Sequence, residues 1–211
     1  MIPYPKINSL YKRIEEPRDG KRSFIEGQYA SEEFDLIKHW QVQEKIDGTN
    51  IRVHYHHGVV SFDGRKDGSQ IPKHLLKFLT EHFTLERMSN AKLQDDQRIT
   101  LYGEGYGPKI QSCGGNYRSD VGFILYDIRI GSWWLDQDAV QGFAGSLEVP
   151  YAPIIGAMTT QEAINFTKSN PLSLCSKTPQ VMEGIICRPY PLLLKRNGEQ
   201  LIMKLKCKDW L

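Results

Sequence analysis

The segment Glu44-Lys45-Ile46-Asp47-Gly48-Thr49-Asn50 most constrains how this chain can fold. Apolar and polar residues alternate before it, from Trp40 to Ile46, and the alternation resumes after it at Ile51, Val53 and Tyr55. A period of two predicts a strand on each side, so Lys45 is expected at a strand-to-strand turn. Gly48 gives such a turn backbone freedom and lets a ligand approach the main chain. An ordinary Asp-Gly hairpin with a solvated lysine shows the same pattern, so a chemical role for Lys45 depends on partners elsewhere.

The size and charge of the chain limit the possible classes. With 211 residues it can bury a core without disulfides or metals. The 27 basic residues nearly balance the 25 acidic ones, so any contact with nucleic acid is expected to be local. The four cysteines form no Cys-x-x-Cys pair, which argues against a disulfide framework and a zinc knuckle. The N-terminus has no signal-peptide pattern, and no apolar run approaches the ~20 residues of a membrane span. We expect a soluble intracellular protein without a membrane partner.

Strand patterns outnumber helix patterns along the chain. Helices are expected from about Pro72, where apolar residues follow a period of 3.6, after a cap at Asp136 or Asp138, and near Thr160. The remaining strands are expected at 59–63, 99–102, 121–128, 132–135, 181–188 and 201–206. Because turns join most of these strands, we expect an α+β fold with mainly antiparallel sheets and flanking helices.

Two other patterns favour structural roles. The loop from Gly103 to Gln111 is glycine-rich, but it lacks the Gly-Lys-Ser/Thr ending of a P-loop and leads into no helix. In His54-Tyr-His56-His57, the alternation of a strand would place His54 and His56 on one face. This strand pattern accounts for their spacing without a metal site.

Charged side chains at strand ends are the partners that Lys45 requires. Lys204 and Lys206 lie two residues apart, so both ammonium groups are expected on one face of a terminal strand. Glu183 opens another strand pattern and Glu104 ends one. As single residues these could simply protect sheet edges. Together they provide what a lysine needs to attack a nucleoside triphosphate, because nearby cations favour the deprotonated, nucleophilic amine and also neutralise charge on the phosphate.

Five ordered motifs resemble the covalent nucleotidyltransferase superfamily of ligases and capping enzymes. They are Lys45-x-Asp-Gly, Gly103-Glu104-Gly105, Phe123 to Ile128, Glu183-Gly184 and Lys204-x-Lys206. Within that superfamily the chain is most similar to ATP-dependent RNA ligases of the T4 RNA ligase 2 type. The similarity includes Lys6-Ile-Asn-Ser-Leu10, the segment from Glu44 to Asn50, and Gly103-Glu104-x-Tyr106-Gly107 with Ile110-Gln111 and Tyr117.

The resemblance implies a role for each matching residue. Lys45 would carry AMP, Glu183 would serve the metal, and Lys204 and Lys206 would hold the α-phosphate. Phe123 would stack on adenine, and Arg65 and Glu104 would lie near the ribose. The full set of implied nucleotide-binding residues is Glu44, Ile46, Asn50, Arg65, Glu104, Gln111 and Phe123.

The resemblance implies a nucleotidyltransferase domain with the nucleotide between its sheets. We expect one such domain over residues 1–211, without the C-terminal OB-type or helical domain that follows in many relatives. The implied reaction uses ATP with Mg²⁺ or Mn²⁺ to form lysyl-AMP, passes AMP to a 5′-phosphate, and seals that end to a 3′-hydroxyl. RNA ends in a nicked duplex would be the substrate, in RNA repair, and a protein partner could assist end binding. The protein would act in the cytoplasm or in a virus-infected cell.

Two departures from the family pattern keep alternatives open. The nearest relatives have histidine where this chain has Asp47. Aspartate at this position is typical of the wider superfamily, so a DNA ligase or a capping-type guanylyltransferase remains possible. Gly64 stands where a basic residue is expected before Arg65. A nucleotide- or nucleic-acid-binding module without turnover is the alternative from a different class.

Overall fold

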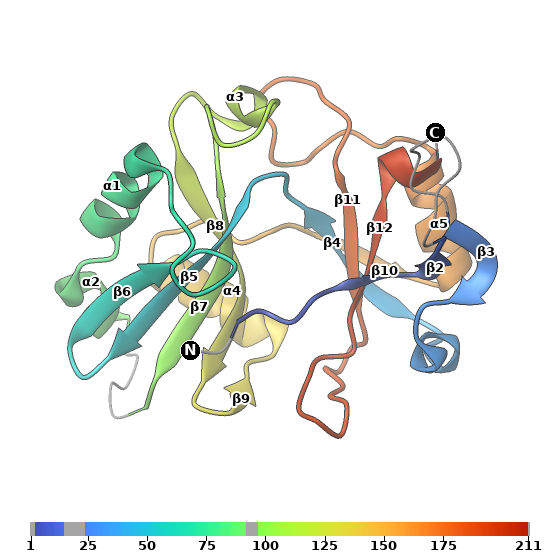
Figure 1. Ribbon diagram of the computed structural model, residues 1–211, viewed down its shortest axis with the longest axis horizontal. Helices are drawn as coiled ribbons and strands as arrows, with labels where there is room; N and C mark the ends of the chain where they lie inside the picture. The colour runs from blue at the N-terminus through green and yellow to red at the C-terminus, as the bar shows by residue number, and fades with distance from the viewer. Residues whose placement is uncertain (1–2, 15–23, 92–96, 211) are drawn as a thin grey trace. The chain divides into compact units, whose positions relative to one another are not determined.

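The computed structural model describes residues 3–14, 24–91 and 97–210, and the chain forms two compact units. Unit 1 contains Ile46–Ala152 with the short segments Met1–Tyr4 and Cys175–Thr178. Unit 2 contains Pro5–Lys45, Pro153–Leu174 and Pro179–Leu211. Each unit has its own sheet and its own apolar core (Figure 1).

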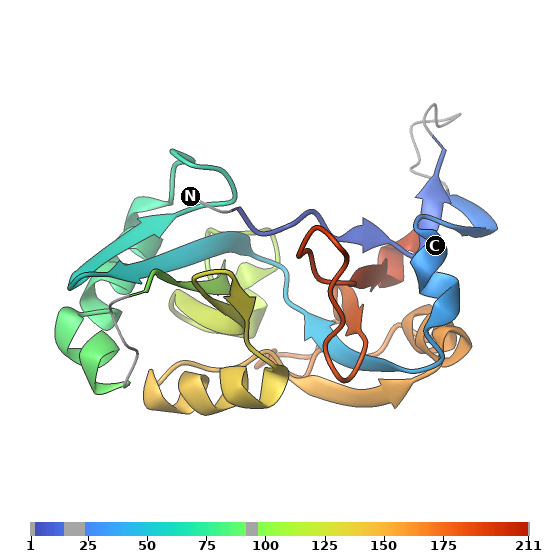
Figure 2. The same ribbon diagram turned by 90° about the horizontal axis from the view of Figure 1, so that it is seen from below.

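Unit 1 is built on a five-stranded antiparallel sheet with the strand order β6-β5-β7-β8-β9. These strands are β5 (Thr49–His56), β6 (Val59–Asp63), β7 (Ile99–Tyr106), β8 (Gly122–Ile130) and β9 (Trp133–Trp134). The helices are α1 (Lys73–His82), α2 (Leu85–Asn90), α3 (Gly114–Tyr117) and α4 (Gln137–Ser146). Figure 2 shows α4 lying along one face of the sheet.

The core of unit 1 lies between this sheet face and its helices. Ile51, Val53 and Tyr55 alternate onto the core face of β5, as their spacing predicts. Leu75 and Leu79, one turn apart on α1, pack against the same face with no exposed surface. Asp136 caps α4, since its side chain accepts a hydrogen bond from the Ala139 amide at 2.8 Å.

Unit 2 contains a second five-stranded sheet, in which only β1 runs parallel to its neighbour. Its order is β1-β12-β11-β4-β10, formed by β1 (Asn8–Ser9), β4 (Trp40–Lys45), β10 (Ile154–Met158), β11 (Gly184–Arg188) and β12 (Met203–Lys206). The smaller pair β2 (Tyr11–Arg13) and β3 (Phe24–Tyr29) is antiparallel. The helical segments are η2 (Glu32–Leu36), α5 (Thr160–Lys168) and η3 (Cys207–Trp210).

The expected α+β class with mainly antiparallel sheets is confirmed. The predicted helix near Thr160 is α5, and Thr159 forms a capping box with Glu162. The sequence did not predict β10, β1, β2 or β3, which are short or lack a regular alternation. All four cysteines are free, and Cys187 and Cys207 are buried while Cys113 is exposed.

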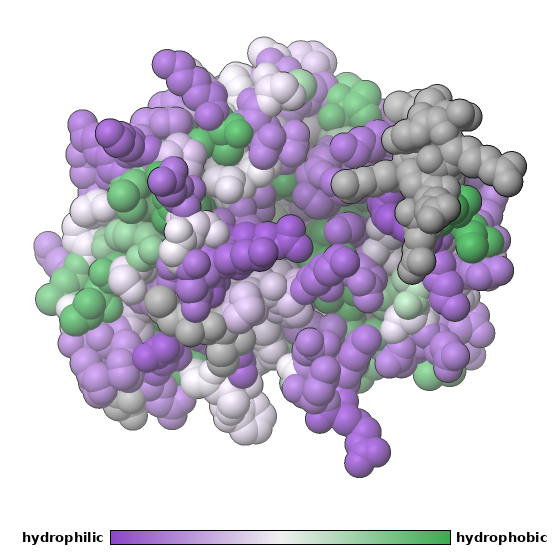
Figure 3. Space-filling model, in the orientation of Figure 1, coloured by the Kyte–Doolittle hydropathy of each residue, from purple (hydrophilic) through white to green (hydrophobic). Residues whose placement is uncertain are grey.

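The surface drawn in Figure 3 is mainly hydrophilic, with apolar side chains in small separate patches. Among the described residues, no helix is long and apolar enough to cross a membrane.

Candidate functional site

Three neighbouring strands of unit 2 bring Lys45 and Lys206 to either side of Gly184. Lys45 is the last residue of β4 and pairs in register with Gly184 on β11, while Lys206 pairs with the same glycine from β12. Gly184 has φ +156°, and a Cβ there would collide with the backbone of β12 at Leu205. The central strand therefore needs glycine at this position for the two lysine-bearing strands to pack beside it.

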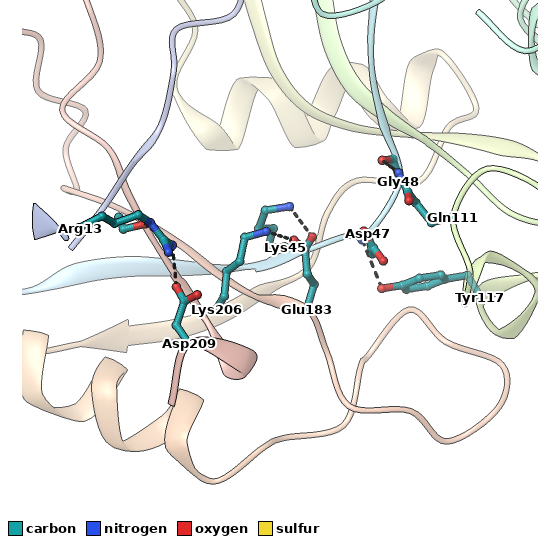
Figure 4. Close-up of polar contacts among 10 residues, drawn as sticks. Arg13, Lys45, Asp47, Gly48, Gln111, Tyr117, Glu183, Lys206 and Asp209 are labelled. Atoms are coloured by element: carbon teal, nitrogen blue, oxygen red, sulfur yellow. Dashed lines mark hydrogen bonds and ion pairs between the residues drawn. The ribbon is translucent and has the colours of Figure 1, made fainter. Parts of the chain in front are cut away.

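Glu183, the residue before β11, accepts hydrogen bonds from both lysines (Figure 4). Lys45 Nζ contacts Glu183 Oε2, and Lys206 Nζ lies 2.5 Å from Glu183 Oε1. Burial raises the pKa of the Glu183 carboxyl, but the charges and hydrogen bonds of Lys45 and Lys206 outweigh this effect and lower it overall. Glu183 is therefore an ionised carboxylate shared between two cations.

Lys204 adds a third cation to this cluster. It lies two residues before Lys206, on the same face of β12, and pairs in register with Ile186. Burial, followed by the charges of Lys206 and Lys45, lowers the pKa of Lys204 from 10.5 to about 8. We call Lys45, Glu183, Lys204 and Lys206 the lysine cluster. Its three cations exceed its one carboxylate, which creates a favourable place for an anion.

Arg13, which no sequence motif predicted, lies beside this cluster. Its guanidinium donates hydrogen bonds to Ser9 Oγ at 2.9 Å and to Asp209 Oδ2 at 3.0 Å. Ser9 pairs in register with Lys204, and the Arg13 charge contributes to lowering the pKa of Lys204, after burial and the two lysines. Arg13 lies outside every motif because β1 and β2 are too short to show a pattern.

The carboxylate of Glu44, which is expected beside the nucleotide, forms hydrogen bonds within unit 2. Its carboxylate accepts hydrogen bonds from Ser173 Oγ at 2.5 Å and from the Leu174 amide at 2.8 Å, and only 2% of Glu44 is exposed. The residue therefore holds the segment after α5 in this state. A contact between Glu44 and a nucleotide stays a prediction.

In unit 1, the turn that follows Lys45 is fixed from several sides. Gln111 Nε2 donates to the Gly48 carbonyl at 2.9 Å, and the Asp47 amide donates to Tyr117 Oη at 3.3 Å (Figure 4). Ile46 is 4% exposed in a small core with Tyr106 and Tyr117. A Cβ at Gly48 would collide with the Gly105 carbonyl. The predicted roles of Ile46 and Gln111 in nucleotide binding are untested, and both residues stabilise the turn.

The predicted stacking of Phe123 on adenine is not supported by its position. Phe123 has no exposed surface and packs in the core of unit 1, with its ring centroid 5.2 Å from that of Phe83. A bulge between β7 and β8 follows, and the aromatic residue that contacts Asn50 is Tyr126, whose hydroxyl accepts a hydrogen bond from Asn50 Nδ2. The ring of Phe123 is therefore enclosed in the core of unit 1, and a contact between Phe123 and adenine stays a prediction.

Glu104 and Arg65 complete the predicted set in unit 1. Glu104 is half-buried and pairs in register with Asn50. Arg65 is exposed on the loop after β6, directly after the buried Gly64. A Cβ at Gly64 would lie 2.9 Å from Ser69 Cβ. That crowding is the physical reason why a larger basic residue does not fit the loop at position 64.

His54, on the histidine-rich strand β5, is buried among polar side chains. His54 is 4% exposed and lies 3.3 Å from Asp63 and 3.1 Å from Thr100 Oγ1. Burial and the Arg52 charge lower its pKa. Within the described part of the chain, no three His, Cys, Asp or Glu side chains are grouped so that they could hold a metal ion.

Comparison with known proteins gives a family and a fold. A family model described as RNA ligase matches residues 38–206. No curated protein matches the chain in sequence.

Several solved structures share the fold. A mutant of the Naegleria gruberi RNA ligase with ATP and Mn has 15% identity and a TM-score of 0.64, covering 98% of this chain and 63% of that chain. An archaeal ATP-dependent RNA ligase has 14% identity and a TM-score of 0.62, covering 99% of this chain and 49% of that one. The Naegleria gruberi RNA ligase with PPi has 18% identity and a TM-score of 0.59, covering 82% of this chain and 51% of that one. The chain thus spans about half the length of two of these structures.

Proposed function

The chain belongs to the RNA ligase family, and from this premise we propose that it is an ATP-dependent RNA ligase whose Lys45 becomes adenylylated. The observation that carries the proposal is the lysine cluster, in which the amine of Lys45 lies with two further cations around a single carboxylate. An excess of positive charge at one end of a sheet suits a polyphosphate.

In the proposed first step, Lys45 Nζ attacks the α-phosphorus of ATP. A P–N bond forms, the P–O bond to the leaving pyrophosphate breaks, and AMP stays on the lysine. The amine must lose a proton and leave its ion pair with Glu183 before it can attack. Lys204 and Lys206 would stabilise the charge that develops on the transferred phosphate.

Glu183 has the right chemistry to hold a divalent cation together with the nucleotide. Mg²⁺ is often bound through one or two carboxylates plus substrate phosphates, so it does not require the grouped protein ligands that the described residues lack. Mg²⁺ or Mn²⁺ would neutralise charge on the phosphates. Engagement of Glu183 by the ion would also weaken its hold on Lys45.

For the sugar and base, we propose side chains of unit 1. Asn50 and Glu104 are cross-strand neighbours, and Tyr126 presents an aromatic ring next to Asn50. We therefore assign base stacking to Tyr126 in place of Phe123, because the ring of Phe123 is enclosed in the core. Arg65 would contact the ribose from its exposed loop.

The second and third steps would transfer AMP to a 5′-phosphate and seal that end to a 3′-hydroxyl with release of AMP. We propose RNA ends at a nick in a duplex as the substrate. A protein partner could contribute to end binding. Support for the nick and the partner comes only from the resemblance to ligases of the T4 RNA ligase 2 type.

Incubation with α-labelled ATP or GTP and Mg²⁺, followed by denaturing electrophoresis, tests the first step. Label from ATP that survives denaturation is expected. Label from GTP would favour capping chemistry, and absence of label would favour a binding module. Sealing of nicks with RNA or DNA on the 3′-hydroxyl side then tests the substrate, because a protein can distinguish the two sugars through the 2′-hydroxyl. Equal sealing of both would contradict the RNA assignment.

A further inference from the structure

A fully buried charge of unit 1 lies at the base of the loop that carries Arg65. The Arg52 side chain on β5 has no exposed surface. Its Nε donates to the Gly64 carbonyl at 2.9 Å, and its Nη2 donates to Asp67 Oδ1 at 2.7 Å. Both partners belong to the segment Gly64–Ser69, which we call the Arg65 loop.

The described hydrogen bonds of the loop's backbone amides are long or lie at the surface. Residues 65–68 are all exposed. Within the loop, the Lys66 amide donates to Ser69 Oγ at 3.1 Å, and the Gly68 amide lies 3.4 Å from Asp63 Oδ1. A short exposed segment held in this way samples many conformations unless it is tied to the core. The bonds from Arg52 supply that tie on both sides of Arg65.

The geometry requires an arginine at position 52. A guanidinium presents several donors in a planar fork, so one side chain can bond a backbone carbonyl and a carboxylate at once, whereas a lysine ammonium is a point charge. Burial of the Arg52 charge would be costly without such partners. Asp63 lies 4.0 Å from the guanidinium and adds a second carboxylate. The Arg52 hydrogen bond is the largest cause of the lowered pKa of Asp67.

We infer that Arg52 is a positioning residue that pre-organises the Arg65 loop for nucleotide binding. The inference rests on the proposed function, since it assigns Arg52 to the task of presenting Arg65 to ATP. A loop already held in its binding conformation loses less conformational freedom when the nucleotide binds. Removing the tie should therefore raise the KM for ATP more than it lowers kcat.

The main test variant lies on the exposed side of the contact, because substitution of buried Arg52 could unfold the chain, and a conservative Arg52 variant accompanies it. Asp67→Ala removes the charged acceptor from a residue whose side chain is 53% exposed. Arg52→Lys keeps the charge but not the fork. The matched control is Glu148→Ala, which removes another exposed carboxylate of unit 1 that pairs with an arginine, Arg87, at 2.8 Å.

The first measurement is cleavage by trypsin after Arg65 and Lys66 in the folded full chain. Cleavage should accelerate in Asp67→Ala and Arg52→Lys, but not in Glu148→Ala. ATP should slow cleavage in the wild type and do so less in the two loop variants. This measurement needs no turnover, so it reports on the tie even if Lys45 takes no label. Unchanged cleavage in both loop variants would overturn the inference.

The second measurement is the ATP dependence of Lys45 labelling. Asp67→Ala should raise the KM for ATP by about fivefold, the range expected for one partly exposed charged contact. If Arg52 acts through Arg65, Arg65→Ala should raise the KM similarly, and Asp67→Ala should add nothing further in the Arg65→Ala background. If Asp67→Ala and Arg65→Ala raise the KM for ATP by independent factors that multiply in the double variant, the positioning role of Arg52 is wrong. A wild type without label, but with ATP protection against trypsin that the loop variants lose, would contradict the ligase proposal and support the loop assignment.

Discussion

The lysine cluster of unit 2 and the buried pair of Arg52 and Asp63 in unit 1 both place charges at a sheet, but with opposite balance. Around Glu183 there are three cations for one carboxylate, and Lys45 and Lys206 keep 22% and 20% of their side-chain surfaces exposed. Around Arg52 there are two carboxylates for one fully buried cation. An excess of positive charge that solvent can reach suits binding and chemistry, whereas enclosed, compensated charge suits anchoring of the backbone. Charge balance and exposure, rather than residue type, distinguish the two.

The largest expected effect in this comparison is the loss of covalent chemistry at Lys45. Lys45→Ala should abolish labelling by α-labelled ATP, because the phosphoramide bond needs the lysine nitrogen. Arginine should not restore it, since a guanidinium stays protonated. The melting temperature should change little, because Lys45 makes its described side-chain ion pair at the partly exposed end of β4. Lys77→Ala, at an exposed lysine of α1, serves as the control, and residual labelling of Lys45→Ala would refute the nucleophile assignment.

Glu183 should give the next largest effect. Glu183→Ala should slow labelling by more than about tenfold when Mg²⁺ is limiting, because a hard cation bridging phosphate oxygens needs a carboxylate anchor. Glu183→Asp should recover part of the rate, through water. The measurement is the labelling rate across a Mg²⁺ titration, with Glu199→Ala, an exposed carboxylate of the same unit, as the control. If Glu183→Ala is labelled at the wild-type rate at every Mg²⁺ concentration, Glu183 has a structural role and does not hold the metal ion.

On the anchoring side of the comparison, Arg52→Met should lower the free energy of unfolding by about 3 kcal/mol, because it leaves buried acceptors without their charged donor. Urea denaturation of the full chain measures this change. A stability equal to that of the wild type would show that the hydrogen bonds from Arg52 do not stabilise the fold.

The smallest expected effect is an increase in the free energy of unfolding, opposite to the decrease expected for Arg52→Met. Lys204→Met should raise the free energy of unfolding at pH 7 by up to about 1 kcal/mol, because it removes a desolvated cation from an excess of cations that solvent partly screens. Labelling should fall in the same variant, since the cation is lost from the phosphate site. Opposite changes in stability and activity would confirm that the lysine cluster is arranged for a ligand.

The pH dependence of stability offers a second test of Lys204. Its pKa in the folded protein is about 8, below the ordinary 10.5. As the pH rises from about 8 toward 10.5, the folded chain has already released this proton while the unfolded chain still binds it, so the contribution of Lys204 to stability increases. Urea midpoints should show this rise in the wild type and not in Lys204→Met. A rise of the same size in both would assign it to other groups.

Motifs with fixed spacing were the most informative part of the sequence. Lys204 and Lys206 lie on one face because a strand repeats every two residues, and strand pairing brings them to Glu183 and Lys45. The predicted α+β class follows from the same alternation. These features depend on local periodicity, which a single sequence records.

Features that depend on tertiary packing could not be predicted from the sequence. The motif that contains Phe123 does not reveal which face of β8 points to the core, and the bulge beside β8 further obscures the alternation. Arg13 lies on a strand of three residues, too short for a pattern. Glu44 meets Ser173 across 129 positions of sequence, and no local pattern predicts such a contact.

The path of the chain has a further consequence for how this protein can be dissected. The backbone passes from one compact unit to the other at residues 4–5, 45–46, 152–153, 174–175 and 178–179, and Lys45 is the last residue on one side of such a passage. Neither unit is a continuous stretch, so no single truncation yields either one intact. A split or circularly permuted version would have to keep the chain continuous at each of the positions where it changes from one unit to the other. The residue that we propose as the nucleophile thus lies at a junction, where an insertion would affect both units.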